Sequence, residues 1–225
     1  MAKRDSGASR SDRIFVWANA EYSAGQPRLE WINPPRQWSE DLHIERPYLP
    51  AGPLFDAQDG SDYGTGFAPF AETPVFVVDR PLGAKPLFDI TGRFRGVFLV
   101  SERAKDVLEK LDLDAFVFVD VETSLANGEQ GPRHWLGDLV RKLDAFDLEK
   151  SEGARIDQVA PLMRFSISPR YDRNVFRRDV IGSAHFFRLK SSAAAIYCDD
   201  VARAALHAAP KLRGISCSHV GTLDA

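Results

Sequence analysis

The chain has 225 residues, of which 44% are hydrophobic and 27% are charged, a balance typical of a globular protein with one large or two small domains. A formal net charge of -3 excludes a general attraction of the whole chain to nucleic acid or to an anionic membrane. With two cysteines, a polar N-terminus without an apolar leader segment and no stretch near the ~18 apolar residues of a membrane span, the sequence predicts a cytoplasmic protein without a disulfide framework.

The first 90 residues predict a tail followed by strands and loops. Residues 1–12 are small and polar, so we expect a disordered tail. IFVWANA at 14–20 and TPVFVVD at 73–79 are rich in β-branched and aromatic residues and predict strands. Eight prolines and five glycines between 21 and 74 leave no helix of useful length. Residues 13–90 are therefore predicted to form a mostly β, loop-rich subdomain.

Two segments of the C-terminal part share one layout at a constant offset of 98 residues. VFLVSERAKDVLEKLDLDAFVFVD (97–120) and AIYCDDVARAALHAAPKLRGISCSHV (195–220) each predict a strand, a helix cap, an amphipathic helix, a turn and a second strand. Apolar residues recur at helical spacing in both, at Ala104, Val107, Leu108 and Leu111 and at Ala202, Ala205, Leu206 and Ala209. The pattern predicts an α/β domain over 91–225 with two repeated βαβ-like units, and α+β is the alternative fold class.

The stretch YCDD at 197–200 raises the question of a catalytic thiol beside two carboxylates. In the aligned repeat, Asp199 corresponds to Ser101, and both are favoured N-cap residues. Cys198 corresponds to Val100, the last residue of a predicted buried strand, where a free cysteine behaves as a small hydrophobic residue. The alignment therefore favours helix caps at Ser101 and Asp199, and we assign no catalytic residue.

Other motifs of site chemistry are absent from the sequence. The five histidines are dispersed, with neither CxxC nor HxxxH spacing. YGTGF (63–67) has two glycines but lacks the third glycine and the following helix of a nucleotide-binding loop. The pattern therefore predicts a turn. The sequence also lacks the Gly-x-Ser-x-Gly motif of many hydrolases. We therefore predict no metal and no cofactor.

Charge is distributed unevenly along the second half of the chain. Residues 97–160 hold 14 acids against 8 Lys and Arg, a net of -6, whereas residues 161–190 hold 7 Lys and Arg against 2 acids, a net of +5. The basic run RFSISPRYDRNVFRRD (164–179) could bind phosphate, form a solvated face or dock on the acidic stretch. The arginines of this run are Arg164, Arg170, Arg173, Arg177 and Arg178.

Within the acidic stretch, HWLGDLVRKLDAFDLEKSEG (134–153) could form a helix or an extended strand with a broken alternation. Its charged residues could belong to a solvated element or to an acidic surface that binds a basic partner. The candidate residues of that surface are Trp135, Asp138, Asp144, Asp147, Glu149 and Glu152.

Four segments resemble immunity family eleven of bacterial polymorphic toxin systems. HWLGDLVRKLDAFDLEKS, HFFRL and IYCDDVARAALHAAPKLRGISC resemble that family's C-terminal signature, and GVFLVSERAKDVLEKLDLDAFVFVDVE resembles its first βαβ unit. The likeness spans about residues 90–220. It implies a cytoplasmic antidote that is not an enzyme and that neutralises a cognate toxin by stoichiometric binding. The toxins of such systems are often nucleases.

An acidic surface with aromatic neighbours would suit that role, because a nuclease presents a basic groove to its substrate. We therefore expect charge reversal to weaken toxin binding without unfolding the protein at Asp138, Asp144, Asp147 and Glu149.

The alternative is a small-molecule-binding domain or hydrolytic enzyme that uses a pocket between the two repeated halves. Residues near the rim of that pocket would be His185, Cys198, Asp199 and Asp200. A third hypothesis, nucleic-acid binding through the five arginines of the basic run, is disfavoured by the net charge.

Overall fold

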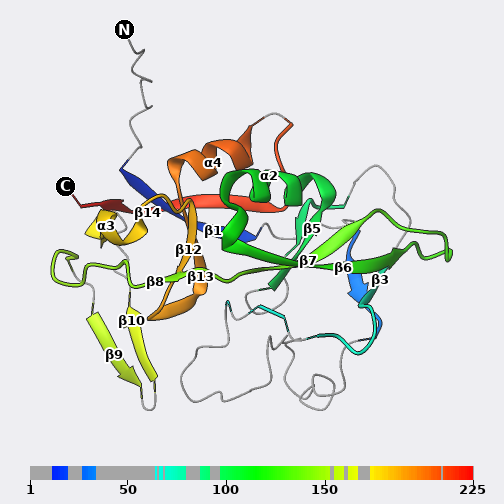
Figure 1. Ribbon diagram of the computed structural model, residues 1–225, viewed down its shortest axis with the longest axis horizontal. Helices are drawn as coiled ribbons and strands as arrows, with labels where there is room; N and C mark the ends of the chain where they lie inside the picture. The colour runs from blue at the N-terminus through cyan, green and yellow to red at the C-terminus, as the bar shows by residue number, and fades with distance from the viewer. Residues whose placement is uncertain are drawn as a thin grey trace, which may run out of the picture.

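The computed structural model describes residues 12–19, 27–33, 64, 66–67, 69–79, 87–91, 97–152, 155–159, 162–166, 173–208 and 210–224. These residues form two six-stranded sheets, a separate two-stranded hairpin and a few helices (Figure 1). Antiparallel pairs predominate in both sheets. The fold class is therefore α+β, the second of the two predicted alternatives.

The first sheet has the order β11-β14-β1-β13-β12-β8. Its strands are β1 (Arg13–Asn19), β8 (Lys142–Leu143), β11 (Val175–Phe176), β12 (Phe186–Leu189), β13 (Ser192–Asp199) and β14 (Ile215–Leu223). Strand β1 lies between β13 and β14 and is antiparallel to both. A strand from the predicted N-terminal subdomain thus pairs on both sides with strands from the end of the chain.

The second sheet has the order β2-β3-β6-β7-β5-β4. Its strands are β2 (Leu29–Trp31), β3 (Val75–Val78), β4 (Ile90–Thr91), β5 (Val97–Ser101), β6 (Phe116–Ser124) and β7 (His134–Leu139). Strand β7 lies between β5 and β6 and is antiparallel to both. The separate hairpin consists of β9 (Arg155–Val159) and β10 (Leu162–Ser166).

Helices connect strands that are not neighbours. Helix α2 (Glu102–Asp112) and the 3-10 turn η1 (Leu113–Ala115) join β5 to β6, and α4 (Asp200–His207) joins β13 to β14. In each case an antiparallel strand, β7 or β1, lies between the two connected strands. Both segments therefore have the predicted strand–helix–strand order, while their descent from one repeated unit stays a prediction. The third helix, α3 (Arg178–Ile181), is a single turn.

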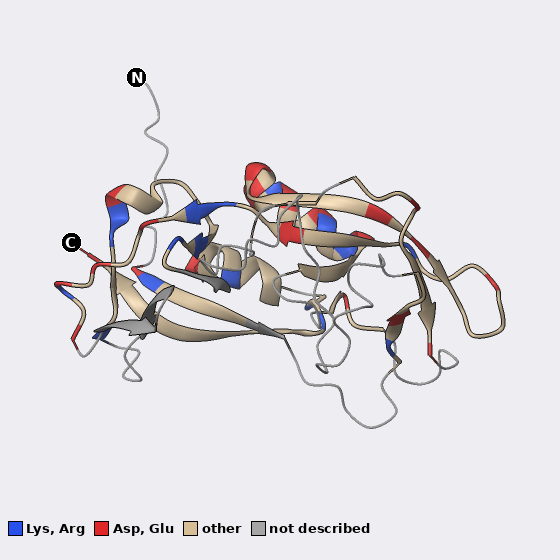
Figure 2. Ribbon diagram, turned by 90° about the horizontal axis from the view of Figure 1, so that it is seen from below, with Lys and Arg blue, Asp and Glu red and all other residues tan. Residues whose placement is uncertain are grey.

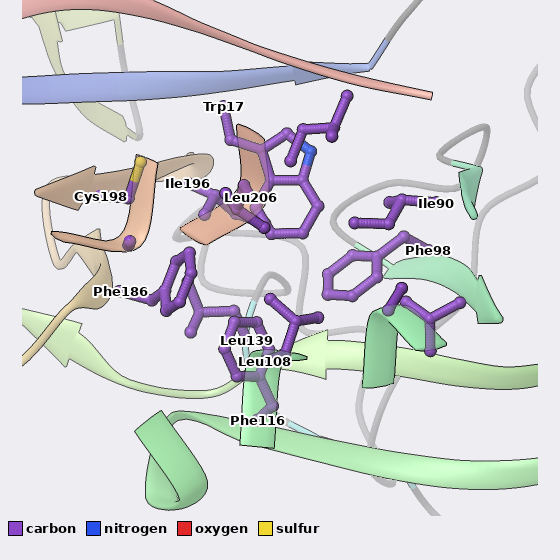
Figure 3. Close-up of a cluster of buried hydrophobic side chains, with 14 of the residues drawn as sticks. Trp17, Ile90, Phe98, Leu108, Phe116, Leu139, Phe186, Ile196, Cys198 and Leu206 are labelled. Atoms are coloured by element: carbon purple, nitrogen blue, oxygen red, sulfur yellow. The ribbon is translucent and has the colours of Figure 1, made fainter. Parts of the chain in front are cut away.

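The central core joins the two sheets and the helices (Figure 3). The rings of Trp17 and Phe98, one from each sheet, lie 5.1 Å apart, and those of Phe116 and Phe186 are also 5.1 Å apart. Leu108 of α2 and Leu206 of α4 are fully buried in the same cluster. At ~1.5–3 kcal/mol for each fully buried large apolar side chain, this cluster is a main source of stability.

Each sheet also buries its other face. Phe176, Phe187 and Tyr197 belong to a second cluster, on the first sheet. Leu99 and Leu136 belong to a third cluster, on the second sheet. A strand in the middle of such a sheet is covered on both faces, and all six residues of β7 are buried. Burial on both faces explains why HWLGDL lacks the alternation typical of a half-exposed strand.

Candidate functional site

The predicted alternative site centres on Cys198, which lies in the central core (Figure 3). Its side chain is fully buried, and it is within hydrogen-bonding reach of Cys217. The hydrogen bond with Cys217, together with burial, raises the pKa of the Cys198 thiol. Because the thiolate is the nucleophilic form, a raised pKa makes this cysteine poorly reactive at neutral pH.

The neighbouring carboxylates stabilise the fold. The Asp199 Oδ1 atom accepts a hydrogen bond from the Ala202 backbone N–H at 2.9 Å, which caps α4, and its Oδ2 lies 2.9 Å from Nδ1 of His185. Asp200 pairs with Arg13 of β1 at 2.9 Å. The structure thus brings the four residues of the alternative site together, but Asp199 already caps α4 and contacts His185, and Asp200 already pairs with β1.

The cap of α2 belongs to a polar cluster around Asp89, which sequence reasoning missed. The Oγ atom of Ser101 accepts from the Ala104 backbone N–H at 3.3 Å and donates to Asp89 at 3.1 Å. Arg103 and the backbone N–H of Arg213 donate to the second Asp89 oxygen at 2.7 and 2.8 Å.

Burial opposes ionisation of Asp89, but hydrogen bonds from Arg103 and Arg213 outweigh it and hold the pKa of Asp89 below its ordinary value. The carboxylate therefore links the start of β4 to α2 and to the segment before β14. No sequence signal marks Asp89, because its partners lie 12 to 124 residues away.

Asp138 is buried, so its carboxylate is not exposed to a partner in this structure. Its side chain is 1% exposed and lies 3.2 Å from the guanidinium of Arg188, which is wholly buried. Arg188 Nε also donates to the Leu139 carbonyl at 2.8 Å, and the Gly66 N–H donates to Asp138 at 3.0 Å. Burial raises the pKa of Asp138 to about 6, although the Arg188 charge and the Gly66 N–H oppose that rise. The central position of β7 in the second sheet accounts for this burial.

Trp135 is also mostly buried, at 8% exposure, and belongs to the central core. The guanidinium of Arg133 lies 4.7 Å from its ring centroid, and the Lys105 amine lies 5.5 Å from it. The ring is therefore covered by two cations of the same chain and offers little surface to a partner, and its role as an interface anchor stays a prediction.

The glycines of the YGTGF segment pack against the buried ion pair. Gly64 and Gly66 have left-handed φ values of +69° and +81°. A Cβ atom on Gly64 would lie 2.6 Å from the Leu139 carbonyl oxygen and 2.9 Å from Cδ of Arg188. Both the φ values and the close approach require glycine here. The flanking Tyr63 and Thr65 lie outside the described residues.

The acidic segment docks on the basic run, which is one of the alternatives left open by the sequence (Figure 2). Asp144 pairs with Arg177 at 3.0 Å, and Glu152 pairs with Arg173. The backbone N–H of Asp147 donates to the Val175 carbonyl at 2.9 Å, and its side chain caps the turn by accepting from the backbone N–H of Lys150 at 3.0 Å. Opposite local charges therefore neutralise each other within the fold.

The described arginines of the basic run do not form a free phosphate site. Arg178 pairs with Asp12, near the start of the chain, and its backbone N–H donates to Asp224, near the end, at 2.8 Å. Arg173 and Arg177 pair with acids. Arg170 lies outside the described residues, and for Arg164 only the strand β10 is described. Among the predicted acidic contact residues, Asp144, Glu149 and Glu152 are exposed.

Within the described ranges, no group of three His, Cys, Asp or Glu side chains could hold a metal ion. None of the described helices is long and apolar enough to cross a membrane.

Comparison with models of protein families identifies the family of this chain. The model of the Immunity protein family (Imm11) matches residues 5–222. The chain belongs to this family. The match extends the resemblance from the C-terminal segments to almost the whole chain, including β1, β2 and β3. A search of the curated proteins found no match. Membership of the Imm11 family gives the protein an immunity role.

Proposed function

We propose that this Imm11 protein is a cytoplasmic antidote that binds its cognate toxin in a 1:1 complex and blocks it without catalysis. The observation that carries the proposal is the family match over residues 5–222. The local chemistry of the YCDD stretch supports a non-catalytic role, because its cysteine is buried and its two carboxylates hold α4 and β1.

The proposed target is a nuclease toxin. A nuclease binds a polyanion through a basic surface, so exposed carboxylates of an inhibitor can occupy that surface in place of phosphates. Asp144, Asp147, Glu149 and Glu152 stay predicted contact residues. Asp144 and Glu152 already pair with Arg177 and Arg173, so a toxin would have to compete for these two acids.

Growth rescue tests the proposal. The protein is co-expressed with the toxin domain encoded by the adjacent gene, and the purified pair is titrated by calorimetry. We expect restored growth and a stoichiometry of one. A toxin domain from an unrelated system serves as the control and should not be neutralised. Absence of both rescue and binding with the adjacent toxin would contradict the immunity proposal for this pair.

A further inference from the structure

Strand β6 has an open edge over much of its length. Strand β7 pairs with residues 116–121 on one side of β6, whereas β3 pairs on the other side with residues 122–124. On the β3 side, no strand in the described part of the chain pairs with residues 116–121. We call this stretch the open edge; in Figure 1, β3 lies beside the far end of β6.

Two hydrogen bonds identify the backbone groups that face the open edge. The Val140 N–H donates to the Ala115 carbonyl at 2.8 Å, which continues the β7 pairing, and the Glu122 N–H donates toward β3, to Pro74, at 2.9 Å. Backbone groups alternate between the two sides of a strand. Even-numbered residues therefore present their N–H and C=O groups to the open side, and along the open edge these are Phe116, Phe118 and Asp120.

The open edge differs from the outer strands of both sheets. Proteins usually keep sheet edges short or place Lys or Pro on them, because unpaired strand groups invite pairing with another chain. The outer strands β4, β8 and β11 have two residues each, and β2 has three. Residues 116–120 instead read FVFVD, with high β-propensity and neither Lys nor Pro. Val117, Phe118 and Val119 are only partly buried.

We propose that the cognate toxin adds an extended strand to the open edge of β6. The inference rests on the proposed function, which supplies a protein partner, and it names the contact surface. In strand addition, main-chain hydrogen bonds contribute affinity and alternate side chains contribute specificity. The three open residues each supply one donor and one acceptor for such bonds.

Charge indicates the chemistry of the toxin strand. Asp114, Asp120 and Glu122 are exposed along β6 and just before it, and Figure 2 shows acidic positions on the hairpin that extends to the right. Among the described residues, Asp120 forms one ion pair, with Arg133 at 3.6 Å, and both side chains are more than half exposed, so that ion pair is weak. The acids therefore favour a strand that carries Lys or Arg.

The side chains of the open edge indicate what the toxin strand would carry on each of its two faces. Phe118 lies on the face of β6 that packs on the central core, under the amine of Lys105 at 5.3 Å, while Val119 packs on the third cluster. A toxin strand that alternates basic and apolar residues fits these two faces. A second copy of this chain fits less well, because antiparallel pairing of two β6 strands would bring the same acids together, and like charges on paired strands are destabilising.

A proline at Asp120 tests the inference directly. Asp120→Pro removes an N–H that points to the open side, so it removes no backbone hydrogen bond within the described part of the chain. Asp120→Ala removes the carboxylate but keeps the N–H, and Asp179→Ala removes an exposed acid of α3, far along the chain from the open edge. With the adjacent toxin domain, we expect Asp120→Pro to raise the Kd about tenfold or more beyond Asp120→Ala, and Asp179→Ala to change it little. Equal affinities of the proline and alanine variants, both folded by circular dichroism, would overturn strand addition.

Amide hydrogen exchange on the wild-type protein gives a second test that does not depend on a variant. The amides of Phe118 and Asp120 should exchange rapidly in the free protein and become protected in the toxin complex. Protection in the free protein would mean that another segment of this chain or a second copy covers the edge, and it would overturn the inference. Toxin binding without protection of these amides would overturn it as well, while leaving the immunity proposal intact. Failure of the wild-type protein to bind or rescue would instead refute the immunity proposal.

Discussion

Replacing Arg188 by methionine should destabilise the protein strongly and in a pH-dependent way. Arg188 is wholly buried, pairs with Asp138 at 3.2 Å and donates to the Leu139 carbonyl at 2.8 Å. Methionine keeps most of the apolar stem but leaves a buried carboxylate without its cation. Removal of one partner of a buried ion pair costs ~3–5 kcal/mol, a large share of the ~5–15 kcal/mol of a typical domain.

The pH dependence follows from the carboxylate that remains. In the wild-type fold the pKa of Asp138 is about 6, against an ordinary value of 3.8. Because the folded pKa is the higher one, this group's contribution to stability is present below about pH 4 and is lost as pH rises through about 6. Arg188 lowers the pKa of Asp138, so Arg188→Met should raise that pKa and extend the loss to higher pH. The variant should therefore be destabilised more at pH 8 than at pH 5, where Asp138 is protonated and the cost falls to ~1–3 kcal/mol.

Urea unfolding followed by tryptophan fluorescence at the two pH values measures both effects. Arg177→Met is the matched control, because Arg177 pairs with Asp144 at 3.0 Å and the Asp144 side chain is 66% exposed. We expect the control to cost at most ~1 kcal/mol at either pH. A cost for Arg188→Met that equals the control, or that does not change between pH 5 and pH 8, would refute the reasoning. The same geometry means that charge reversal at Asp138 would place a second cation beside Arg188, so the fourfold charge reversal suggested by the sequence should unfold the protein.

Three further substitutions test the remaining structural claims. Asp199→Ala removes the cap of α4 and the His185 contact and should lower the free energy of unfolding by ~1–2 kcal/mol in urea titrations; an unchanged midpoint would contradict the capping role. Cys198→Ala should cost ~1 kcal/mol of stability through lost packing and leave toxin neutralisation unchanged, whereas loss of neutralisation in the folded variant would point to a role for the thiol. Gly214→Ala places a Cβ atom against the Ile90 carbonyl oxygen at a backbone φ of +93°. It should lower the free energy of unfolding by ~2 kcal/mol or more, and the Tm by several degrees. A wild-type Tm in calorimetry would contradict this close approach.

The parts of the fold that were predictable from the sequence depend on local physical chemistry. Helices α2 and α4 follow from apolar residues at helical spacing, and their caps follow from an oxygen-bearing side chain just before the first turn. The burial of Cys198 followed from alignment with Val100, which is also buried. Each of these features is determined within a few residues, so one sequence contains enough information.

The parts that were not predictable depend on contacts between distant segments. Nothing in IFVWANA indicates that β1 lies between β13 and β14, about 180 to 210 residues later in the chain. The burial of Asp138 depends in the same way on Arg188, 50 residues away, and on Gly66, 72 residues away. A charged residue in an apolar strand is predicted to be exposed unless its ion-pair partner is known. Which residue becomes that partner depends on which strands are neighbours in the sheets.

Charge illustrates the same limit and bears directly on function. Part of the acidic stretch counted along the chain pairs with the basic stretch, through Asp144 with Arg177 and Glu152 with Arg173. A local excess of acids therefore does not identify a binding surface until the internal pairs have been removed from the count. Just before β6 and along it, Asp114 and Glu122 form no ion pair with the described residues, and Asp120 has only a weak one. These acids lie within or next to the open edge, so the two features that could bind a basic toxin strand, charge and unpaired hydrogen-bonding groups, coincide at β6.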